Sequence, residues 1–225
     1  MDRMPPPAPF KVLVFSATAA FRHESIPSGI AALQRLSAAS QTTSTPFSVD
    51  CSEDAARSFN ASSLAQYRVV VLLQASGEFL TTSTQIDAFQ AFVRAGGGVV
   101  GVHCASFAMQ SDDWYGRMIG AVFDNHPEPQ RGRINIVDPT HPIITASLGN
   151  GQGMQKEEAS GCWKWDWLDE WYNFKMHPHS GPAGDNDLHV LLTVDETSYS
   201  GGTHGEDHPV AWCQEFDGGR SFYAA

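Results

Sequence analysis

Three short runs of apolar residues constrain the fold of this chain more than any other feature of its sequence. They lie within Lys11–Phe15, Arg68–Gln74 and Gly98–Val102. Each has the length of a β-strand, and apolar residues that are continuous rather than alternating are typical of a strand buried on both faces of a sheet. These three runs therefore predict the central strands of a sheet that has helices on both sides.

The segments between these runs have the spacing of amphipathic helices. Pro27–Ala39 has apolar residues on one helical face and a proline in its first turn. Thr81–Arg94 has similar spacing and is followed by glycines, which commonly end a helix. Alternating strands and helices predict right-handed crossovers and a flavodoxin-like, doubly wound α/β sheet that is mostly parallel. Two further elements are expected in this half, a strand at Phe47–Asp50 and a short helix at Ser62–Tyr67.

The second half of the chain is less regular. Strands are expected at four places and are interpreted as a partly antiparallel extension of the sheet, with an exposed loop at Gly149–Gly161. After a flexible leader over residues 1–10, residues 11–225 are expected to form a single domain. The four expected strands are Arg131–Val137, Glu170–Phe174, His189–Val194 and Pro209–Phe216.

Charge and hydropathy exclude several classes of partner. The chain has 25 acidic against 14 basic residues, a net charge of -11, which disfavours nucleic acid and anionic membranes. A small, neutral or weakly charged ligand fits this balance better. No apolar run approaches the roughly 20 residues that span a bilayer, and the proline-rich start lacks the apolar core of a secretory signal. We therefore expect a cytoplasmic protein that does not enter the membrane, and a homo-oligomer is left open.

The cysteines and histidines show no metal-binding spacing. Cys51, Cys104, Cys162 and Cys213 are far apart in sequence, so we expect free, mostly buried thiols. His204 and His208 are four residues apart but lie among glycines that indicate a loop, where helical ligand spacing does not apply. No cofactor and no metal ligand are predicted. A divalent metal site assembled by the fold is left open, because spacing cannot reveal it.

A histidine follows the third apolar run directly. In Gly101-Val-His103-Cys-Ala105 a small residue lies two positions before and two positions after His103. Small neighbours of this kind permit the sharp strand-to-helix turn known as a nucleophile elbow. A histidine at that position can transfer protons near neutral pH. Cys104 is one position further on and is expected to point elsewhere. Cys104 as a nucleophile is left open, and a buried histidine bound only to backbone is the structural alternative.

Several motifs, in order, resemble the ThuA-like (trehalose utilisation) family, which has the fold of the class I glutamine amidotransferases. The resemblance extends from Lys11 over nearly the whole chain. It implies a histidine where the amidotransferases place their cysteine nucleophile, so glutaminase activity is not implied. The motifs are Phe21-Arg-His23 with Ser25-Ile26, Gly96-Gly-Gly98 with Gly101-Val-His103, Trp114-Tyr115 with Gly120 and Phe123, His126-Pro127, His141-Pro142, Asp169-Glu-Trp-Tyr172, Asp195-Glu196 and His208-Pro-Val-Ala-Trp212.

The resemblance implies carbohydrate metabolism, close to enzymes that make 3-keto sugars. Converting or cleaving a keto sugar requires removal of a proton next to a carbonyl. We therefore expect an isomerase or lyase that acts on a sugar or keto-sugar glycoside by histidine-mediated proton transfer. Two alternatives stay open: a non-catalytic sugar-binding or regulatory domain, and a metal-assisted hydrolase.

The predicted site combines a proton-transfer group with residues that bind the sugar. His103 is the expected acid or base, with His23 or Glu170 as its counterpart, and Arg22 is expected to stabilise an oxyanion unless it forms a structural salt bridge. Aromatic rings are expected to stack on the sugar, with core packing as their alternative. The other predicted substrate-binding residues are Trp114, Tyr115, His126, Trp171, Asp195, Glu196 and His208.

Two further segments, an aromatic run and the C-terminal residues, also lead to predictions. Trp163-Lys-Trp-Asp-Trp167 alternates aromatic and polar residues, so on a strand its three rings would share one face, either to bind carbohydrate or to anchor the neighbouring loop. Gly218–Ala225 ends within an apparent strand, whereas ThuA-like proteins typically continue with a Gly-His segment. We therefore expect a chain cut short at its C-terminus.

Overall fold

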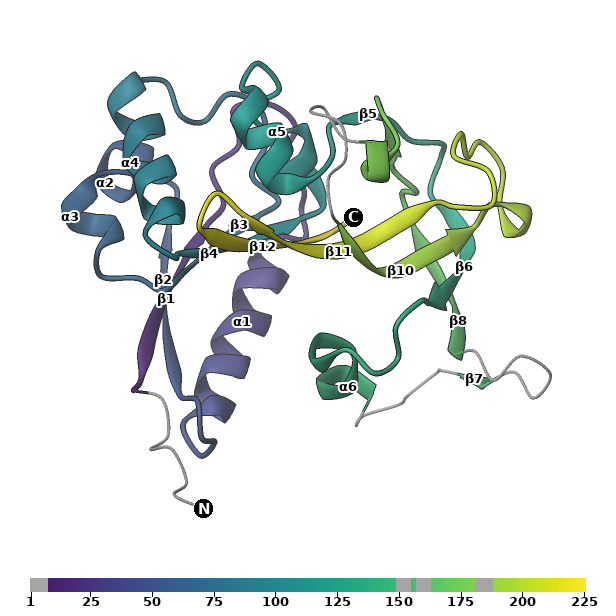
Figure 1. Ribbon diagram of the computed structural model, residues 1–225, viewed down its shortest axis with the longest axis horizontal. Helices are drawn as coiled ribbons and strands as arrows, with labels where there is room; N and C mark the ends of the chain where they lie inside the picture. Colours follow the sequence, from purple (N-terminus) through teal and green to yellow (C-terminus); the bar gives the residue numbers. More distant parts are fainter. Residues whose placement is uncertain (1–7, 149–154, 157–162, 181–187) are drawn as a thin grey trace. The chain divides into compact units, whose positions relative to one another are not determined.

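The structure, a computed structural model, describes residues 8–148, 155–156, 163–180 and 188–225. It divides into two compact units, one formed by Met1–Asp112 with Glu215–Ser221 and the other by Asp113–Gln214 with Phe222–Ala225 (Figure 1). Within the described residues, no helix is long and apolar enough to cross a membrane. The expected single domain over residues 11–225 stays a prediction.

A parallel sheet forms the centre of the first unit. Its strands β1 (Phe10–Phe15), β2 (Phe47–Ser52), β3 (Val69–Leu73) and β4 (Gly98–Val102) lie in the order β2-β1-β3-β4, and every pair is parallel. The three apolar runs are thus adjacent strands, β1, β3 and β4. Together with the antiparallel strands of the second unit, this confirms the predicted α/β class with an antiparallel extension.

Apolar side chains cover both faces of β1 and β3, as continuous apolar runs require. On one face, Val14 and Val71 pack with Ile30 and Leu33 of helix α1 (Ile26–Ser40). On the other face, the ring of Phe15 lies 4.8 Å from that of Phe59. Phe59 in turn contacts Phe89, 5.1 Å away on helix α4 (Ser83–Arg94). The sheet is therefore sandwiched between helices.

Local capping sets the helix boundaries in this unit. Helix α4 begins at Ser83 rather than at Thr81 because the Thr82 hydroxyl accepts a hydrogen bond from the Gln85 backbone and the Gln85 side chain binds back, a capping box. The single short helix predicted at Ser62–Tyr67 is replaced by two one-turn helices. They are α2 (Ala55–Ser58), capped by Asp54, and α3 (Ala61–Leu64), capped by Asn60.

The second unit is built on antiparallel strands. Strands β11 (Pro209–Phe216), β10 (His189–Asp195), β6 (Gln130–Ile136), β8 (Trp163–Asp169) and β7 (Gln155–Lys156) lie in that order, and the last two residues of β11 belong to the first unit. Strand β12 (Gly219–Ala224) has residues in both units. The remaining elements are α5 (Asp113–Ile119), β5 (Phe123–Asn125), α6 (Pro142–Leu148), β9 (Asn173–Phe174) and the 3-10 turns η2 (Pro178–Ser180) and η3 (Glu196–Ser198).

One predicted strand of this unit is wrong in its bounds. Only Asn173–Phe174 of Glu170–Phe174 is a strand, and it pairs with β5. The strand β8 ends at Asp169, whose carboxylate accepts a hydrogen bond from the Glu170 backbone. Trp171 is then buried beside Ile134 and Val194. The loop predicted at Gly149–Gly161 falls largely outside the described residues, apart from the two residues of β7.

The capping box generates a stability prediction. Thr82→Ala should lower the free energy of unfolding by about 1 kcal/mol, because the first turn of α4 loses a side-chain acceptor. Urea denaturation of the full chain measures this change. Thr81→Ala is the matched control, since Thr81 contributes only its backbone N–H to Gln85. Equal stability of the two variants would show that the capping box does not hold the helix.

Candidate functional site

Polar side chains gather where the parallel strands of the first unit end. Such strand ends are where open α/β sheets bind ligands. The loop after β1 carries His23, and it is fixed to the loop after β3 because the Ser76 hydroxyl donates a 2.6 Å hydrogen bond to the Phe21 carbonyl. Ser25 and Gln74 bond to each other through their side chains, 2.9 Å apart. His103 follows β4 at once, so parallel pairing brings His23 and His103 to one edge.

The turn at His103 has the geometry of an elbow. Val102 is extended, whereas His103 has a φ of +52°. This lies in the left-handed region of backbone conformation, which residues other than glycine rarely adopt. The chain continues as a 3-10 turn, η1 (His103–Phe107). Gly101 and Ala105, the small residues on either side of the turn, are both buried.

His103 and His23 contact each other through their ring nitrogens. The two Nε2 atoms lie 3.1 Å apart, and the rings meet edge to face with centroids 4.6 Å apart. Two imidazole nitrogens at this distance form a hydrogen bond only when one is protonated and the other is not. The contact is thus suited to holding one proton between two bases. Of the two predicted counterparts of His103, His23 is the one the structure places against it.

Cys104 joins this pair, which corrects the expectation that it points elsewhere. Its Sγ lies 3.3 Å from Nδ1 of His23 and is 2% exposed. The expectation assumed that successive side chains alternate, which holds only along an extended strand. In a 3-10 turn successive side chains are about 120° apart, so neighbouring residues can face the same group. His23 therefore bridges the Cys104 thiol and the His103 imidazole.

Arg22 forms a salt bridge at the same edge. Its guanidinium lies 2.7 Å from the Glu53 carboxylate, and both side chains are about half exposed, at 49%. Glu53 also accepts a 3.3 Å hydrogen bond from the hydroxyl of Ser16. The salt-bridge alternative is therefore the one observed. Glu53 was missed as a site residue, although an acidic residue directly after a strand of the sheet was a usable signal.

Phe21 is a second residue that the sequence prediction overlooked. Its ring is 64% exposed and lies 4.8 Å from the imidazole of His23, edge to face. An exposed aromatic ring beside the imidazole pair offers an apolar surface to a ligand. The position of Phe21, two residues before His23, is the signal that could have identified it.

The remaining predicted site residues belong to the second unit. There His126 and Glu170 form a pair, with Nε2 of His126 3.6 Å from the carboxylate, and the His126 ring stacks on Tyr172. The role of Glu170 as a counterpart of His103 stays a prediction. Three predicted aromatic residues are buried, which favours core packing over contact with a sugar. These are Trp114, Tyr115 and Trp171.

His208, Glu196 and Asp195 each bond to nearby backbone or side-chain groups. His208 is fully buried, its Nε2 lies 2.8 Å from the Tyr172 carbonyl, and its Nδ1 lies 2.7 Å from Glu196. Burial raises the pKa of Glu196, but hydrogen bonds from the backbone of His204 and Gly205 outweigh it and lower that pKa. Asp195 accepts a hydrogen bond from the Thr197 backbone, capping η3. These contacts favour a structural role for all three residues.

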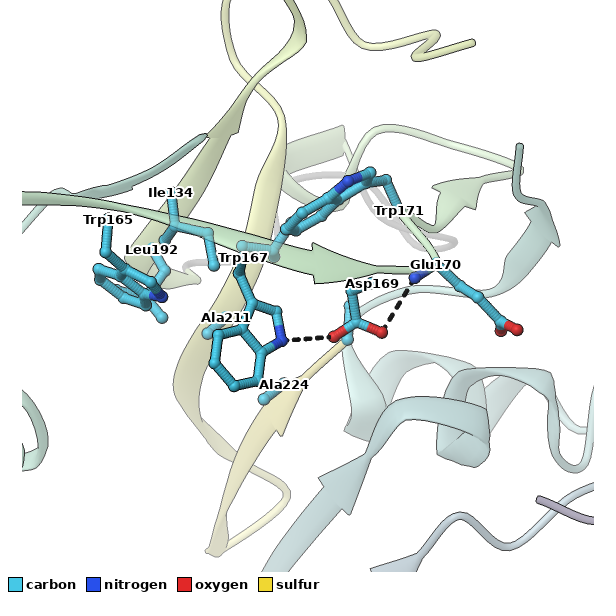
Figure 2. Close-up of a pocket in the computed structure, with 11 residues that line it drawn as sticks. Ile134, Trp165, Trp167, Asp169, Glu170, Trp171, Leu192, Ala211 and Ala224 are labelled. Carbon is cyan, nitrogen blue, oxygen red and sulfur yellow. Dashed lines mark hydrogen bonds between the residues drawn. The ribbon is translucent and has the colours of Figure 1, made fainter. Parts of the chain in front are cut away.

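The second unit also contains an aromatic cavity of about 320 Å³ (Figure 2). Trp165 and Trp167 of β8 both line it, as the alternation predicts for rings on one face of a strand. The Trp167 indole donates a 3.2 Å hydrogen bond to Asp169, and its side chain is 54% exposed. Glu170 also lines the cavity, and Figure 2 shows its carboxylate pointing away from Trp165 and Trp167. This indole surface is the most open aromatic surface among the residues that line the cavity.

The cysteines in the described part of the chain are not in disulfides, as expected. Cys104 is buried, Cys213 is partly buried and Cys51 is exposed, so the expectation of mostly buried thiols is only partly met. Burial raises the pKa of the thiols of Cys51 and Cys213. Cys213 has one histidine neighbour, His141, whose Nε2 is 3.8 Å from its Sγ. Cys162 lies outside the described residues.

The fold and the elbow define the class of this protein: a doubly wound α/β protein with a histidine at the sharp turn after β4. The sequence profile of the ThuA family, described as trehalose utilisation, matches residues 11–225. The chain belongs to the ThuA family. Among curated proteins, none matches the sequence.

Solved structures share the fold at low sequence identity. A ThuA-like protein from Bacteroides uniformis is 21% identical with a TM-score of 0.65, over 96% of this chain and 80% of its own. One from Parabacteroides merdae is 19% identical with a TM-score of 0.68, over 96% and 79%. A protein from Salmonella typhimurium described as cytoplasmic is 12% identical with a TM-score of 0.55, over 96% and 87%. These likenesses support the fold.

The left-handed turn generates a prediction about stability. His103→Val should lower the free energy of unfolding by about 1–2 kcal/mol more than His103→Asn, because asparagine tolerates a positive φ and a β-branched residue does not. Both variants lose the imidazole contacts, so the difference between them isolates the backbone. Urea denaturation measures it. Equal stabilities would contradict a backbone that is held in this conformation.

A second prediction concerns pH. Burial, followed by the charges of His208 and His177, lowers the pKa of His204 from 6.5 to about 4. In that interval the unfolded chain binds more protons than the folded one, so the free energy of unfolding falls as the pH drops from 6.5 through 4. His204→Gln should therefore reduce this dependence in urea titrations run across the interval. An unchanged slope in the variant would exclude His204 as its source.

Proposed function

We propose that this protein is a carbohydrate-metabolism enzyme that acts on a sugar or keto-sugar glycoside by proton transfer, as an isomerase or lyase. The observation that carries the proposal is the 3.1 Å contact between Nε2 of His103 and Nε2 of His23 at the carboxyl end of the parallel sheet. The family description, trehalose utilisation, supports a sugar as substrate.

The imidazole pair has the properties that such a reaction needs. A proton next to a sugar carbonyl is removed by a neutral base, and the resulting enediolate is then protonated or expels a leaving group. An imidazole changes its charge near neutral pH, and two imidazoles that share one proton provide an acid and a base side by side. In this scheme the substrate enters between the two rings and replaces their hydrogen bond. Nε2 of the ring that lacks the shared proton takes up the substrate proton, and Nε2–H of the other ring returns one. After the product leaves, a proton passes back between the two Nε2 atoms and restores the pair.

The hydrogen bonds around His23 give this proton a route. When the Cys104 thiol donates to Nδ1 of His23, Nε2 of His23 carries a proton and donates to Nε2 of His103. In that arrangement Nε2 of His103 is an acceptor and its proton is on Nδ1. Cys104 is thus a positioning residue that selects the tautomer of His23.

The rim of the site suits a sugar. Phe21 offers an apolar ring, while Arg22 and Glu53 offer donors and acceptors for hydroxyl groups. Because a guanidinium has five N–H donors, Arg22 can hold Glu53 and still donate to a developing oxyanion. The cytoplasmic location and the small-molecule carbohydrate partner expected from sequence belong to this same proposal.

A variant series tests the proton-transfer step. His103→Gln and His23→Gln should each reduce turnover of 3-keto disaccharides by about 10²–10⁴-fold, because glutamine keeps hydrogen bonding but cannot exchange the proton. Incorporation of deuterium from heavy water into the carbon next to the carbonyl, followed by NMR, measures the step directly. His189→Gln, at an exposed imidazole paired with Asp138, is the matched control and should retain the wild-type rate.

Two results would count against this function. Wild-type exchange rates in both the His103 and the His23 variants would remove the imidazoles from the mechanism. Absence of any turnover, with sugar still bound by the wild-type protein, would favour the non-catalytic alternative.

That alternative, a sugar-binding domain, has one observation in its favour: the cavity beside Trp165 and Trp167. An exposed indole held by a carboxylate is a suitable platform for a sugar ring. Under this reading Trp167→Ala weakens sugar binding in calorimetry, whereas His103→Gln leaves it unchanged. If the protein is the proposed enzyme, His103→Gln lowers sugar turnover more than Trp167→Ala does.

A further inference from the structure

The cluster of His23, His103 and Cys104 has a property that proton transfer does not require. One donor atom from each residue lies within 4.8 Å of the other two. Among the residues that the structure describes, no other group of histidine, cysteine and acidic side chains brings three such atoms so close together. We propose that these three residues form a binding site for a thiophilic divalent metal ion of the zinc type.

The spacing of the donor atoms fits a tetrahedral ion. With bonds of about 2.0–2.1 Å to nitrogen and about 2.3 Å to sulfur, the ligand atoms of a tetrahedral zinc site lie about 3.3–3.7 Å apart. The two Nε2 atoms are 3.1 Å apart, and Sγ of Cys104 is 4.0 Å from Nε2 of His23. All three donors lie within 4.8 Å of one another, so side-chain rotations that move single donor atoms by up to about an ångström bring them to coordination distance.

The chemistry of the donors selects the kind of ion. Two imidazoles and a thiolate are ligands of zinc and other ions that favour nitrogen and sulfur, whereas calcium and magnesium prefer oxygen. Three protein ligands leave one position open on a tetrahedral ion. His23 is only partly buried, so the open position has a route to solvent, while His103 and Cys104 are buried and held by the elbow.

A cysteine and histidine pair elsewhere in the chain shows why the third donor of the cluster matters. Cys213 and His141 also approach each other, at 3.8 Å between Sγ and Nε2, but they form no three-donor group. A pair of ligands binds a metal far more weakly than three pre-positioned ones, because each missing ligand must be replaced by water. Cys213 is therefore a matched control for Cys104.

Metal and proton compete for the same nitrogen lone pairs. A metal ion bound to both Nε2 atoms displaces the proton that they share, and coordination of the Cys104 thiol releases another. Metal binding does not depend on the proposed proton-transfer function, but its effect on activity does. An ion at the site would then inhibit proton transfer, so the occupancy of the site would regulate the enzyme.

Cobalt(II) is the probe for the site, since it replaces zinc and reports its ligands by absorption. The full chain, reduced and stripped of metal with a chelator, is titrated with cobalt(II) and then with zinc(II). We expect one ion per chain, the visible bands of tetrahedral cobalt, a near-ultraviolet band of thiolate-to-cobalt charge transfer, and loss of both signals when zinc is added.

Substitutions assign the signal to residues. Cys104→Ser should abolish the charge-transfer band, and His23→Gln and His103→Gln should each weaken cobalt binding by at least about 10-fold. Cys51→Ser, Cys162→Ser and Cys213→Ser are the controls and should bind like the wild-type chain. Circular dichroism confirms that each variant is folded. Cys104→Ala serves as a second test if the serine variant unfolds.

The outcomes separate the two proposals. An unchanged charge-transfer band in both Cys104 variants, or its loss in a control variant, would assign the metal elsewhere and overturn this site. Absence of tetrahedral cobalt bands in the wild-type chain would do the same. One-to-one binding without any sugar turnover would establish the metal site while refuting the proton-transfer function. Binding together with turnover that zinc suppresses would support both.

Discussion

Burial of β1 and β3 on both faces is the constraint on which the first unit depends. Val14 and Val71 pack towards helix α1, and Phe15 packs towards Phe59 on the opposite face. A strand covered on both sides has its direction and register fixed by packing, so the residues that follow it leave the sheet at a defined edge. His23 and His103 are 80 residues apart in sequence and meet at 3.1 Å for this reason.

The elbow after β4 brings the side chains of His103 and Cys104 into contact with His23. A positive φ at His103 changes the direction of the chain within one residue, and the 3-10 turn that follows brings Cys104 round to His23. The same geometry supports two uses of one cluster. As a hydrogen-bonded series it can move a proton, and as three convergent donors it can hold a metal ion, but it cannot do both at once.

The second unit uses its polar residues differently. Glu196 accepts hydrogen bonds from the His204 backbone and the His208 ring, and these contacts keep a loop with several glycines in one conformation. The sequence motif that contains His208 is therefore explained by the folding of this loop. In contrast, Trp167 on β8 is exposed beside a cavity rather than used in such a network.

The sequence by itself determined the central parallel strands, the two long helices beside them and the class of fold, because continuous apolar runs and helical spacing are local properties of the chain. It also singled out His103, since small neighbours permit a sharp turn. It could not show that Cys104 shares a site with His23 or that Glu53 holds Arg22, because contacts between distant residues depend on strand order and on the path after each strand. It likewise placed a strand at Glu170–Phe174, where β8 ends at Asp169, Trp171 is buried beside Ile134 and Val194, and only Asn173–Phe174 is a strand. Tertiary structure decided those contacts, since packing rather than local preference sets which side chains meet.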